Sequence, residues 1–366
     1  MSGAGQENGG HEDGRHLATA PVPAPSSTDA AVRRGLPDRL RFLRAVDPYV
    51  AALVATVALA CLLPATGRAA DSVGIASDVA IGLLFFLYGA RLSTRETLAG
   101  LRHVKLHVLV LLATFVLFPV LGLAAVMLPQ LPDQLHAGVL YLCVVPSTVQ
   151  SSVALTGLAK GNVPAAICAG TYSSLLGLAA TPLLAAWLIG SEAALSADGL
   201  LRLGGQLLAP FIAGQLLRRW IGGFVARHKR VLGPVDRGSI LLVVYTAFSS
   251  GMNQGVWHQV TVSSLLVLLA VLTALFVVAL GCTQGAARLI GLDPPSRIAA
   301  VMCGSQKSLA SGLPMAAVLF GGRAALIVLP LMAYHQLQLV ICAALARRWA
   351  RPPGRVLSTP TATVTP

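Results

Sequence analysis

The residues that could do chemistry in this chain fall in two polar stretches, each inside an otherwise apolar segment. Residues 302–314 read Met-Cys-Gly-Ser-Gln-Lys-Ser-Leu-Ala-Ser-Gly-Leu-Pro, and residues 146–157 read Pro-Ser-Thr-Val-Gln-Ser-Ser-Val-Ala-Leu-Thr-Gly. A lysine at the centre of a membrane costs about 2.5–3.5 kcal/mol on insertion scales. Such a stretch survives when it lies inside a helix bundle or beside a watery cavity. The hydroxyls, amides and single ammonium therefore indicate a binding site for a solute or an ion.

From these stretches we select the side chains and backbone groups that could bind a solute or an ion. They are Ser147, Thr148, Gln150, Ser151, Ser152, Ser305, Gln306, Lys307 and Ser308. We expect the helices to break where proline removes an N–H donor or glycine allows unusual backbone angles. Those positions are Pro146, Gly304, Gly312 and Pro314. The alternative is a proline-kinked helix whose serines bond back to their own carbonyls.

Lys307 has several readings that the sequence leaves open. It could bind an anionic substrate, carry a proton, or take the place that a bound cation holds in related proteins. It could also be a buried structural cation that bridges the unwound carbonyls of both stretches without touching substrate.

Two further segments carry polar side chains at helical spacing. His335 and Gln338 are three residues apart, and Tyr334 and Gln338 are four apart, so these side chains share one helix face. Thr171 and Ser174 lie among small residues in an earlier segment. We take His335, Gln338, Thr171 and Ser174 as candidate ligands, with hydrogen bonding and close packing between helices as the alternative.

The composition excludes most other classes of protein. Of the 366 residues, 55% are hydrophobic and 11% are charged, and the mean hydropathy is +0.74, as expected for a polytopic membrane protein. The net charge of +13 does not indicate nucleic-acid binding, because the arginines cluster between apolar segments. No CxxC spacing, phosphate loop or Ser/His/Asp arrangement is present, and we expect neither an enzyme nor a cofactor.

The apolar segments predict an all-α transmembrane domain over 41–350, between disordered tails at 1–40 and 351–366. We expect ten membrane-spanning helices. They lie near 48–65, 73–92, 106–129, 135–158, 163–189, 200–220, 239–256, 260–286, 297–320 and 324–346.

The basic residues predict the orientation of these helices. Arginine and lysine gather before the first segment and after the second, fourth, sixth, eighth and tenth, whereas the intervening loops hold few. Both termini should therefore face the cytoplasm. Ten helices divide into two inverted five-helix repeats, about 45–190 and 198–348, and the polar stretches fall in the fourth helix of each. Polar, interrupted helices at equivalent positions of two repeats point to the binding site of a transporter.

Five stretches of the chain also resemble a known family. They are 85–93 (Phe-Phe-Leu-Tyr-Gly-Ala-Arg-Leu-Ser), 146–162, 173–182, 303–314 and 330–336 (Pro-Leu-Met-Ala-Tyr-His-Gln). Over essentially all of 40–350 the chain resembles the bile acid:sodium symporter superfamily, in the branch of sodium/bile acid cotransporter 7. The resemblance implies a panel domain and a core domain, with helices four and nine unwound and crossing at mid-membrane.

The resemblance also implies a position for sodium. Ser151 and Ser152 stand at or next to a Ser-Asn pair of the family, Thr171 and Ser174 lie close to its helix-five ligands, and Gln306 matches a glutamine ligand. We therefore place a candidate sodium ion near Ser151, Ser152, Thr171 and Gln306. However, a family glutamate falls at about Met302, and the asparagine that follows it becomes Lys307. Both changes weaken sodium binding.

These features predict a secondary active transporter in the cell membrane. We expect it to move an organic, anionic solute by alternating access, with sodium as a candidate coupling ion. Its partners would be the solute and membrane lipids, not nucleic acid, and the oligomeric state stays open. One alternative is efflux of an arsenite-like oxyanion, suggested by Cys143 and Cys303 beside the two polar stretches. Another is a membrane regulator that transports nothing.

Overall fold

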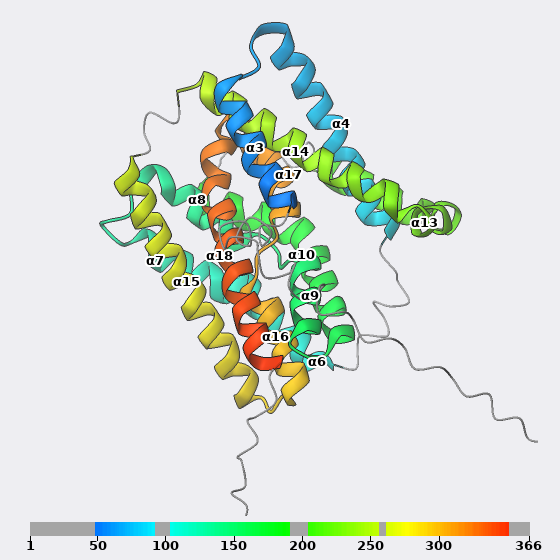
Figure 1. Ribbon diagram of the computed structural model, residues 1–366, viewed down its shortest axis with the longest axis vertical. Coiled ribbons are helices and arrows are strands. Elements are labelled where there is room, and N and C mark those ends of the chain that lie inside the picture. Colours follow the sequence, from blue (N-terminus) through cyan, green and yellow to red (C-terminus); the bar gives the residue numbers. More distant parts are fainter. Residues whose placement is uncertain (1–47, 92–102, 191–203, 256–260, 351–366) are drawn as a thin grey trace, which may run out of the picture. The chain divides into compact units, whose positions relative to one another are not determined.

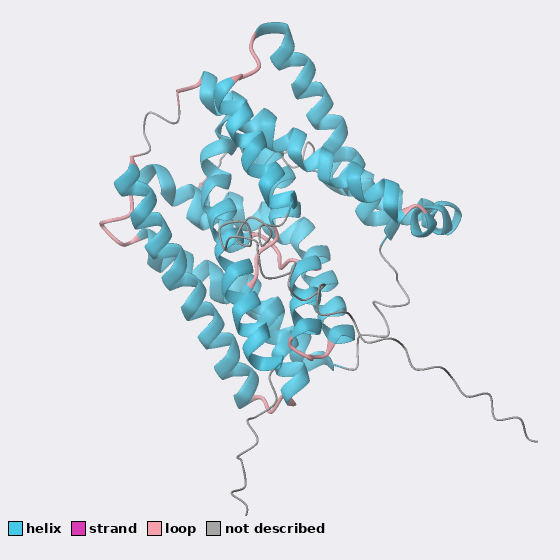
Figure 2. Ribbon diagram, viewed as in Figure 1, coloured by secondary structure: helices cyan, strands magenta, loops and turns pink. Residues whose placement is uncertain are grey.

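The computed structural model describes residues 48–91, 103–190, 204–255 and 261–350 of the chain. Within these ranges all regular structure is helical, and short linkers separate the helices (Figures 1 and 2). The elements are α3 (Pro48–Leu62), α4 (Gly67–Arg91), α6 (Val104–Leu112), η2 (Ala113–Leu117), α7 (Phe118–Val126), α8 (Asp133–Val144), α9 (Gln150–Leu158), α10 (Val163–Ile189), η3 (Gly204–Leu208), α13 (Ala209–Arg227), α14 (Lys229–Asn253), α15 (Val262–Leu289), α16 (Pro294–Ser305), α17 (Leu309–Phe320), η5 (Gly321–Arg323) and α18 (Ala324–Ala350). The tails predicted at 1–40 and 351–366 lie outside the described residues.

Six stretches of the described chain are long and apolar enough to cross a membrane. They are Gly67–Arg91, Val104–Val126, Val163–Ile189, Arg230–Asn253, Val262–Leu289 and Pro294–Ala350. The last of these holds α16, α17 and α18, whereas α8 and α9 are each too short to be counted alone. Each of the ten expected segments is helical over most of its length, and ten crossings in two inverted repeats stay a prediction.

Helices α4, α13 and α14 pack closely together. At the crossing of α4 and α13, two glycines face backbone carbonyls reciprocally. A Cβ atom on Gly89 would overlap the carbonyl oxygen of Phe211, and one on Gly214 would overlap that of Phe86. Helices in membranes use small residues in this way to bring their backbones together.

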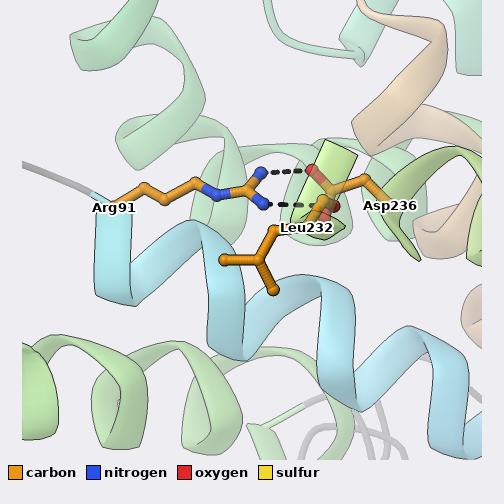
Figure 3. Close-up of polar contacts among 3 residues, drawn as sticks. All are labelled: Arg91, Leu232 and Asp236. Atoms are coloured by element: carbon orange, nitrogen blue, oxygen red, sulfur yellow. Dashed lines mark hydrogen bonds and ion pairs between the residues drawn. The ribbon is translucent and has the colours of Figure 1, made fainter. Parts of the chain in front are cut away.

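An ion pair joins the last residue of α4 to α14. The Arg91 guanidinium donates to the Asp236 carboxylate and, at 3.4 Å, to the carbonyl of Leu232 one turn earlier (Figure 3). The other end of α14 holds the linker that follows α3, where Tyr245 donates to the Leu63 carbonyl at 2.8 Å and Asn253 to the Ala65 carbonyl at 2.7 Å.

A second set of helices gathers around α8, α10, α16 and α18. Helix α8 packs on α18 and α10, and α16 contacts α6, α9, α10 and α15. Small side chains line the contact of α10 with α16, where Ala165, Ala166 and Ala169 are buried against Ala299 and Ala300. Helix α14 contacts α17 and α18, and so joins the two sets.

The structure corrects two sequence-based boundaries. The loop expected between 220 and 239 is helical, because α13 runs to Arg227 and α14 begins at Lys229. Arginine and lysine favour helix, so a basic stretch need not be a loop.

Gly304, Gly312 and Pro314 do not break a helix. Gly304 lies within α16, the other two lie within α17, and the interruption is at 306–308. Proline is tolerated in such helices because neighbouring groups satisfy the freed carbonyl.

The glycine crossing can be tested by substitution. Gly89→Ala and Gly214→Ala should each lower the stability of the purified protein by about 1–3 kcal/mol, because the added methyl group forces the two backbones apart. The measurement is a thermal melt in detergent. Gly82→Ala, in the same helix but with no atom within 4 Å of the new Cβ, should be neutral or stabilising by about 0.5–1 kcal/mol. Equal melting temperatures for all three variants would contradict the crossing.

Candidate functional site

Two helices are interrupted, and the interruptions contact each other. The first linker, 145–149, separates α8 from α9, and the second linker, 306–308, separates α16 from α17. The Ser308 N–H donates to the Pro146 carbonyl at 2.8 Å, and the Ser147 hydroxyl donates to the carbonyl of Cys303. Both Val145 and Gln306 have extended backbone angles. Residues more than 150 positions apart in the chain thus meet through backbone groups that a continuous helix would have used internally.

Pro146 explains why the first linker unwinds. It has no N–H to donate, and it disfavours helical angles for Val145 before it. Helix α10 supplies the missing partners: the Ser147 N–H donates to the Ser173 hydroxyl at 2.9 Å, and the Thr181 hydroxyl donates to the Val144 carbonyl at 2.8 Å. Gly177 makes room, since a Cβ there would lie 2.7 Å from the ring of Pro146.

Lys307 lies at the centre of the contact and is fully buried. Its Nζ donates to the backbone carbonyl oxygens of Thr114 at 3.0 Å, Cys143 at 2.8 Å and Val145 at 2.9 Å. We call these three oxygens the carbonyl cage. An ammonium group has three N–H donors, so the cage satisfies all of them. The ring of Phe118 lies 4.1 Å from Nζ and adds a cation–π contact.

The cage exists because each of its carbonyls has lost a helical partner. Those of Cys143 and Val145 lie at the unwound end of α8. Thr114 lies in the π-helical turn η2, where the Phe118 N–H donates to the carbonyl of Ala113 instead of the carbonyl of Thr114. The next residue is Pro119, which has no N–H. The positive charge also faces the C-terminal end of α8, where the helix dipole is negative.

Helix α18 holds the second linker in place. The Gln338 side chain accepts from the Lys307 N–H at 2.8 Å and donates to the Lys307 carbonyl at 2.9 Å. Its amide nitrogen also lies 2.9 Å from Nδ1 of His335. The Tyr334 hydroxyl donates to the Ser305 carbonyl at 2.8 Å. The face predicted for Tyr334, His335 and Gln338 therefore supports backbone at the linker.

A second polar contact lies at the start of α9 and is partly exposed. The Ser151 hydroxyl donates to the side-chain oxygen of Gln306 at 2.7 Å and lies 3.4 Å from the hydroxyl of Thr148. Ser152 is fully buried, and its hydroxyl bonds back to the Thr148 carbonyl. Gln150, the first residue of α9, is exposed.

The structure brings most of the predicted site residues together. Ser147, Thr148, Ser151, Ser152, Ser305, Gln306, Lys307, Ser308, His335 and Gln338 lie in one connected set of contacts around the linkers. Ser308 caps α17 by accepting from the Ser311 N–H at 3.3 Å. Thr171 and Ser174 lie half-buried on α10, with no contact to this set among the hydrogen bonds described.

Sequence reasoning missed the residues that complete the site from other helices. Thr114 and Phe118 contact the Lys307 ammonium, and Thr181 holds the first linker. Ser173, which the sequence marks only as a polar residue in a closely packed segment, holds the same linker. Tyr141 joins α8 to α17 by donating to the Gly312 carbonyl at 2.6 Å. Pro119 was a visible signal that a carbonyl one turn earlier is freed, and the π-helical bonding of η2 makes that carbonyl the one of Thr114 and not of Phe115.

One link between the two halves of the chain lies at the beginning of two membrane-spanning stretches. Asn162 caps α10 and Asp293 caps α16, and the Asn162 side chain donates to the Ser296 hydroxyl at 3.2 Å. Hydrogen bonding from Ser296, foremost from its side chain, lowers the pKa of the Asp293 carboxyl from its ordinary value. Asp293 therefore stays ionised and suits the N-terminal end of its helix.

Comparison with known proteins identifies the family. The model of the SBF-like CPA transporter family matches residues 47–351. The chain belongs to this family. An uncharacterized protein of Pseudomonas aeruginosa is 51% identical over 320 residues, which cover 86% of this chain and 95% of that protein. YfeH of Escherichia coli, named as a candidate symporter, is 43% identical over 318 residues, which cover 85% of this chain and 95% of YfeH.

More distant relatives in the SBF-like CPA transporter family carry a functional name. Sodium/bile acid cotransporter 7 of Xenopus tropicalis is 29% identical over 317 residues, which cover 84% of this chain and 91% of that protein. The predicted resemblance is confirmed. The protein is a multi-pass membrane transporter of the bile acid:sodium symporter type, and a small-molecule solute is its substrate.

The support given by α18 yields a prediction. Gln338→Met keeps the approximate side-chain volume but leaves the buried N–H and carbonyl of Lys307 unsatisfied, at about 1–3 kcal/mol for each group. The melting temperature of the purified variant should fall clearly below that of the wild type. Gln336→Met, on the same helix and partly exposed, is the matched control. If the two variants have the same melting temperature, Gln338 does not hold the second linker.

Proposed function

We propose that the protein is a secondary active transporter that moves an organic, anionic solute across the cell membrane by alternating access. In this proposal ten helices in two inverted repeats cross the membrane, with both termini in the cytoplasm. The observation that carries it is the contact between the two linkers. Transporters place such interrupted helices at the midplane, where unwound backbone and half-helix ends bind solutes and ions.

The polarity of the half-helices supports an anionic solute. Helices α9 and α17 both begin at the linkers, so the positive ends of their dipoles lie there. The first turn of α9 has no side-chain cap. Ser151 in that turn is partly exposed, whereas Gln306, which accepts from the Ser151 hydroxyl, is buried. N–H groups of a helix start bind carboxylate, sulfate or phosphate groups well. A solute anion would be held by Gln150, Ser151 and Gln306, near the positive charge of Lys307.

The two sets of helices supply the moving parts. Helices α4, α13 and α14 pack with one another, with close glycine contacts between α4 and α13, and both linkers belong to the other set. Of the three, α14 contacts α17 and α18, so motion of one set against the other would expose the linkers in turn. This division agrees with the panel and core domains that the resemblance implies.

We assign no cofactor, and sodium is the coupling ion that the relatives' names suggest. The residues present fit a sodium ion poorly. Ser151, Ser152, Thr171 and Gln306 offer neutral oxygens, and the hydroxyl of Ser152 already bonds to the Thr148 carbonyl. No carboxylate lies in an ion pair with Lys307 among the described residues, and the fixed ammonium adjoins Gln306 in the chain. A hard cation with neutral ligands beside a fixed positive charge is unfavourable.

The structure gives no support to the arsenite alternative. Cys143 and Cys303 are both fully buried. The Cys143 sulfur packs against Gly122, since a Cβ added to this glycine would lie 2.7 Å from the sulfur. The Cys303 thiol lies 3.6 Å from the Ala166 carbonyl. The alternative of a regulator that transports nothing depends on the tails, which lie outside the described residues.

Transport should be measured in proteoliposomes with a panel of radiolabelled organic anions that includes a conjugated bile acid. Uptake of at least one anion should exceed that of empty liposomes, and Ser151→Ala with Gln306→Ala should reduce it about 10–100-fold, because hydrogen bonds to a charged group are lost. Gln254→Ala, at the end of α14, is the control and should transport normally. The proposal is wrong if no anion is taken up, or if the double variant transports like the wild type.

A further inference from the structure

We infer that the Lys307 ammonium is a resident cation: it fills a carbonyl cage which, once the side chain is shortened, binds a free monovalent cation. The native protein then needs no sodium ion at the linkers. The consequence for transport rests on the proposed function. The cage itself rests only on contacts within the chain.

The hydrogen bonds of Nζ fit a protonated ammonium group and not a neutral amine. Three carbonyl oxygens lie 2.8–3.0 Å from it. A neutral amine has two N–H donors and one lone pair, so one of the three carbonyls would face the lone pair and be left unsatisfied. Rings of backbone carbonyls bind potassium in the selectivity filters of channels, where they replace the hydration shell of the ion.

The ammonium also has no donor left for another partner. All three N–H groups point at the cage, and the side chain is 0% exposed. Direct bonding of Lys307 to a solute anion, one of the readings of the sequence, would require it to leave the cage and strand the carbonyls of Thr114, Cys143 and Val145. Lys307 therefore acts through its field on a solute held elsewhere.

The cage does not depend on the ammonium for its shape. Thr181 and Ser173 hold the first linker through Val144 and Ser147. The shifted hydrogen bond of η2 and the missing N–H of Pro119, and not Lys307, leave the Thr114 carbonyl without a helical donor. Gln338 holds the backbone of Lys307 itself. Shortening the side chain should therefore leave three oriented carbonyls around an empty position, closed on one side by the ring of Phe118.

The geometry also predicts which cations would bind. The lost part of the side chain in Lys307→Ala is n-propylammonium, which matches both the charge and the volume that the side chain vacates. Ammonium and potassium share the low charge density of Nζ, whereas choline carries a charge without N–H donors and is too large to enter. The cage should therefore favour n-propylammonium and ammonium over choline at equal ionic strength.

The test is the thermal stability of Lys307→Ala, expressed, extracted and purified in n-propylammonium chloride and then exchanged into chloride salts of single cations. We expect a low melting temperature in choline chloride and a saturable rise of at least about 5 °C in ammonium or n-propylammonium chloride. The wild type and Lys105→Ala, which removes an exposed lysine of α6, should melt at the same temperature in every salt.

Lys307→Met separates the loss of charge from the loss of volume. The methionine side chain fills the volume of the lysine side chain without carrying a charge. The Lys307→Met protein should therefore be unstable in every salt and gain nothing from n-propylammonium. Three results overturn the inference: a Lys307→Ala protein that responds equally to choline, one that cannot be recovered folded in any of the salts, or a Lys307→Met protein as stable as the wild type.

Transport adds an independent measurement. Wild-type uptake of any anion that the proteoliposome panel identifies as a substrate should be unchanged when sodium is replaced by choline on both sides of the membrane. Uptake that collapses without sodium would overturn the resident cation while leaving the transporter proposal intact. If no anion is transported at all, the proposed function fails, and the melting experiment still decides whether the cage binds cations.

Discussion

The bonds between one ammonium group and three backbone carbonyls hold the two interrupted helices together. A buried charge without partners is among the most destabilising features a protein can contain, and carbonyls without donors are costly in a membrane. At Lys307 each group satisfies the other. The unwound ends of α8 and η2 make the lysine tolerable, and the lysine makes their unwinding tolerable. Removing either one alone strands the other.

Polar side chains on the neighbouring helices make this arrangement specific. Helix α10 contributes Ser173 and Thr181, and α18 contributes Tyr334 and Gln338, and each of the four bonds to backbone at or beside a linker. Small residues let these helices approach, as Gly177 does at the ring of Pro146. Most polar side chains that look like ligands in the sequence therefore serve the backbone. Ser151, which is partly exposed and donates to the buried Gln306, is the position that we propose for a solute.

Membership of the SBF-like CPA transporter family does not by itself specify the coupling ion. Several relatives bear names that include sodium, but a family fold can be kept while the chemistry of its site changes. In this chain a tethered charge lies where unwound carbonyls converge. A tethered charge cannot be released at the end of a transport cycle, whereas a bound ion can. In our inference, the residue that secures the fold at this point also bears on energy coupling.

The sequence by itself determined the class of protein, the approximate helices, the family and the two polar stretches, because apolar length and interrupted polarity are local properties of the chain. It also paired Tyr334 and Gln338 on one face, since helical spacing is local. Only the tertiary structure decided that 306–308 unwinds while Gly312 and Pro314 stay helical, and that Thr114 completes the carbonyl cage. Those outcomes depend on which hydrogen-bond donors and acceptors meet across the bundle, often more than 100 residues apart, and no local pattern specifies such partners.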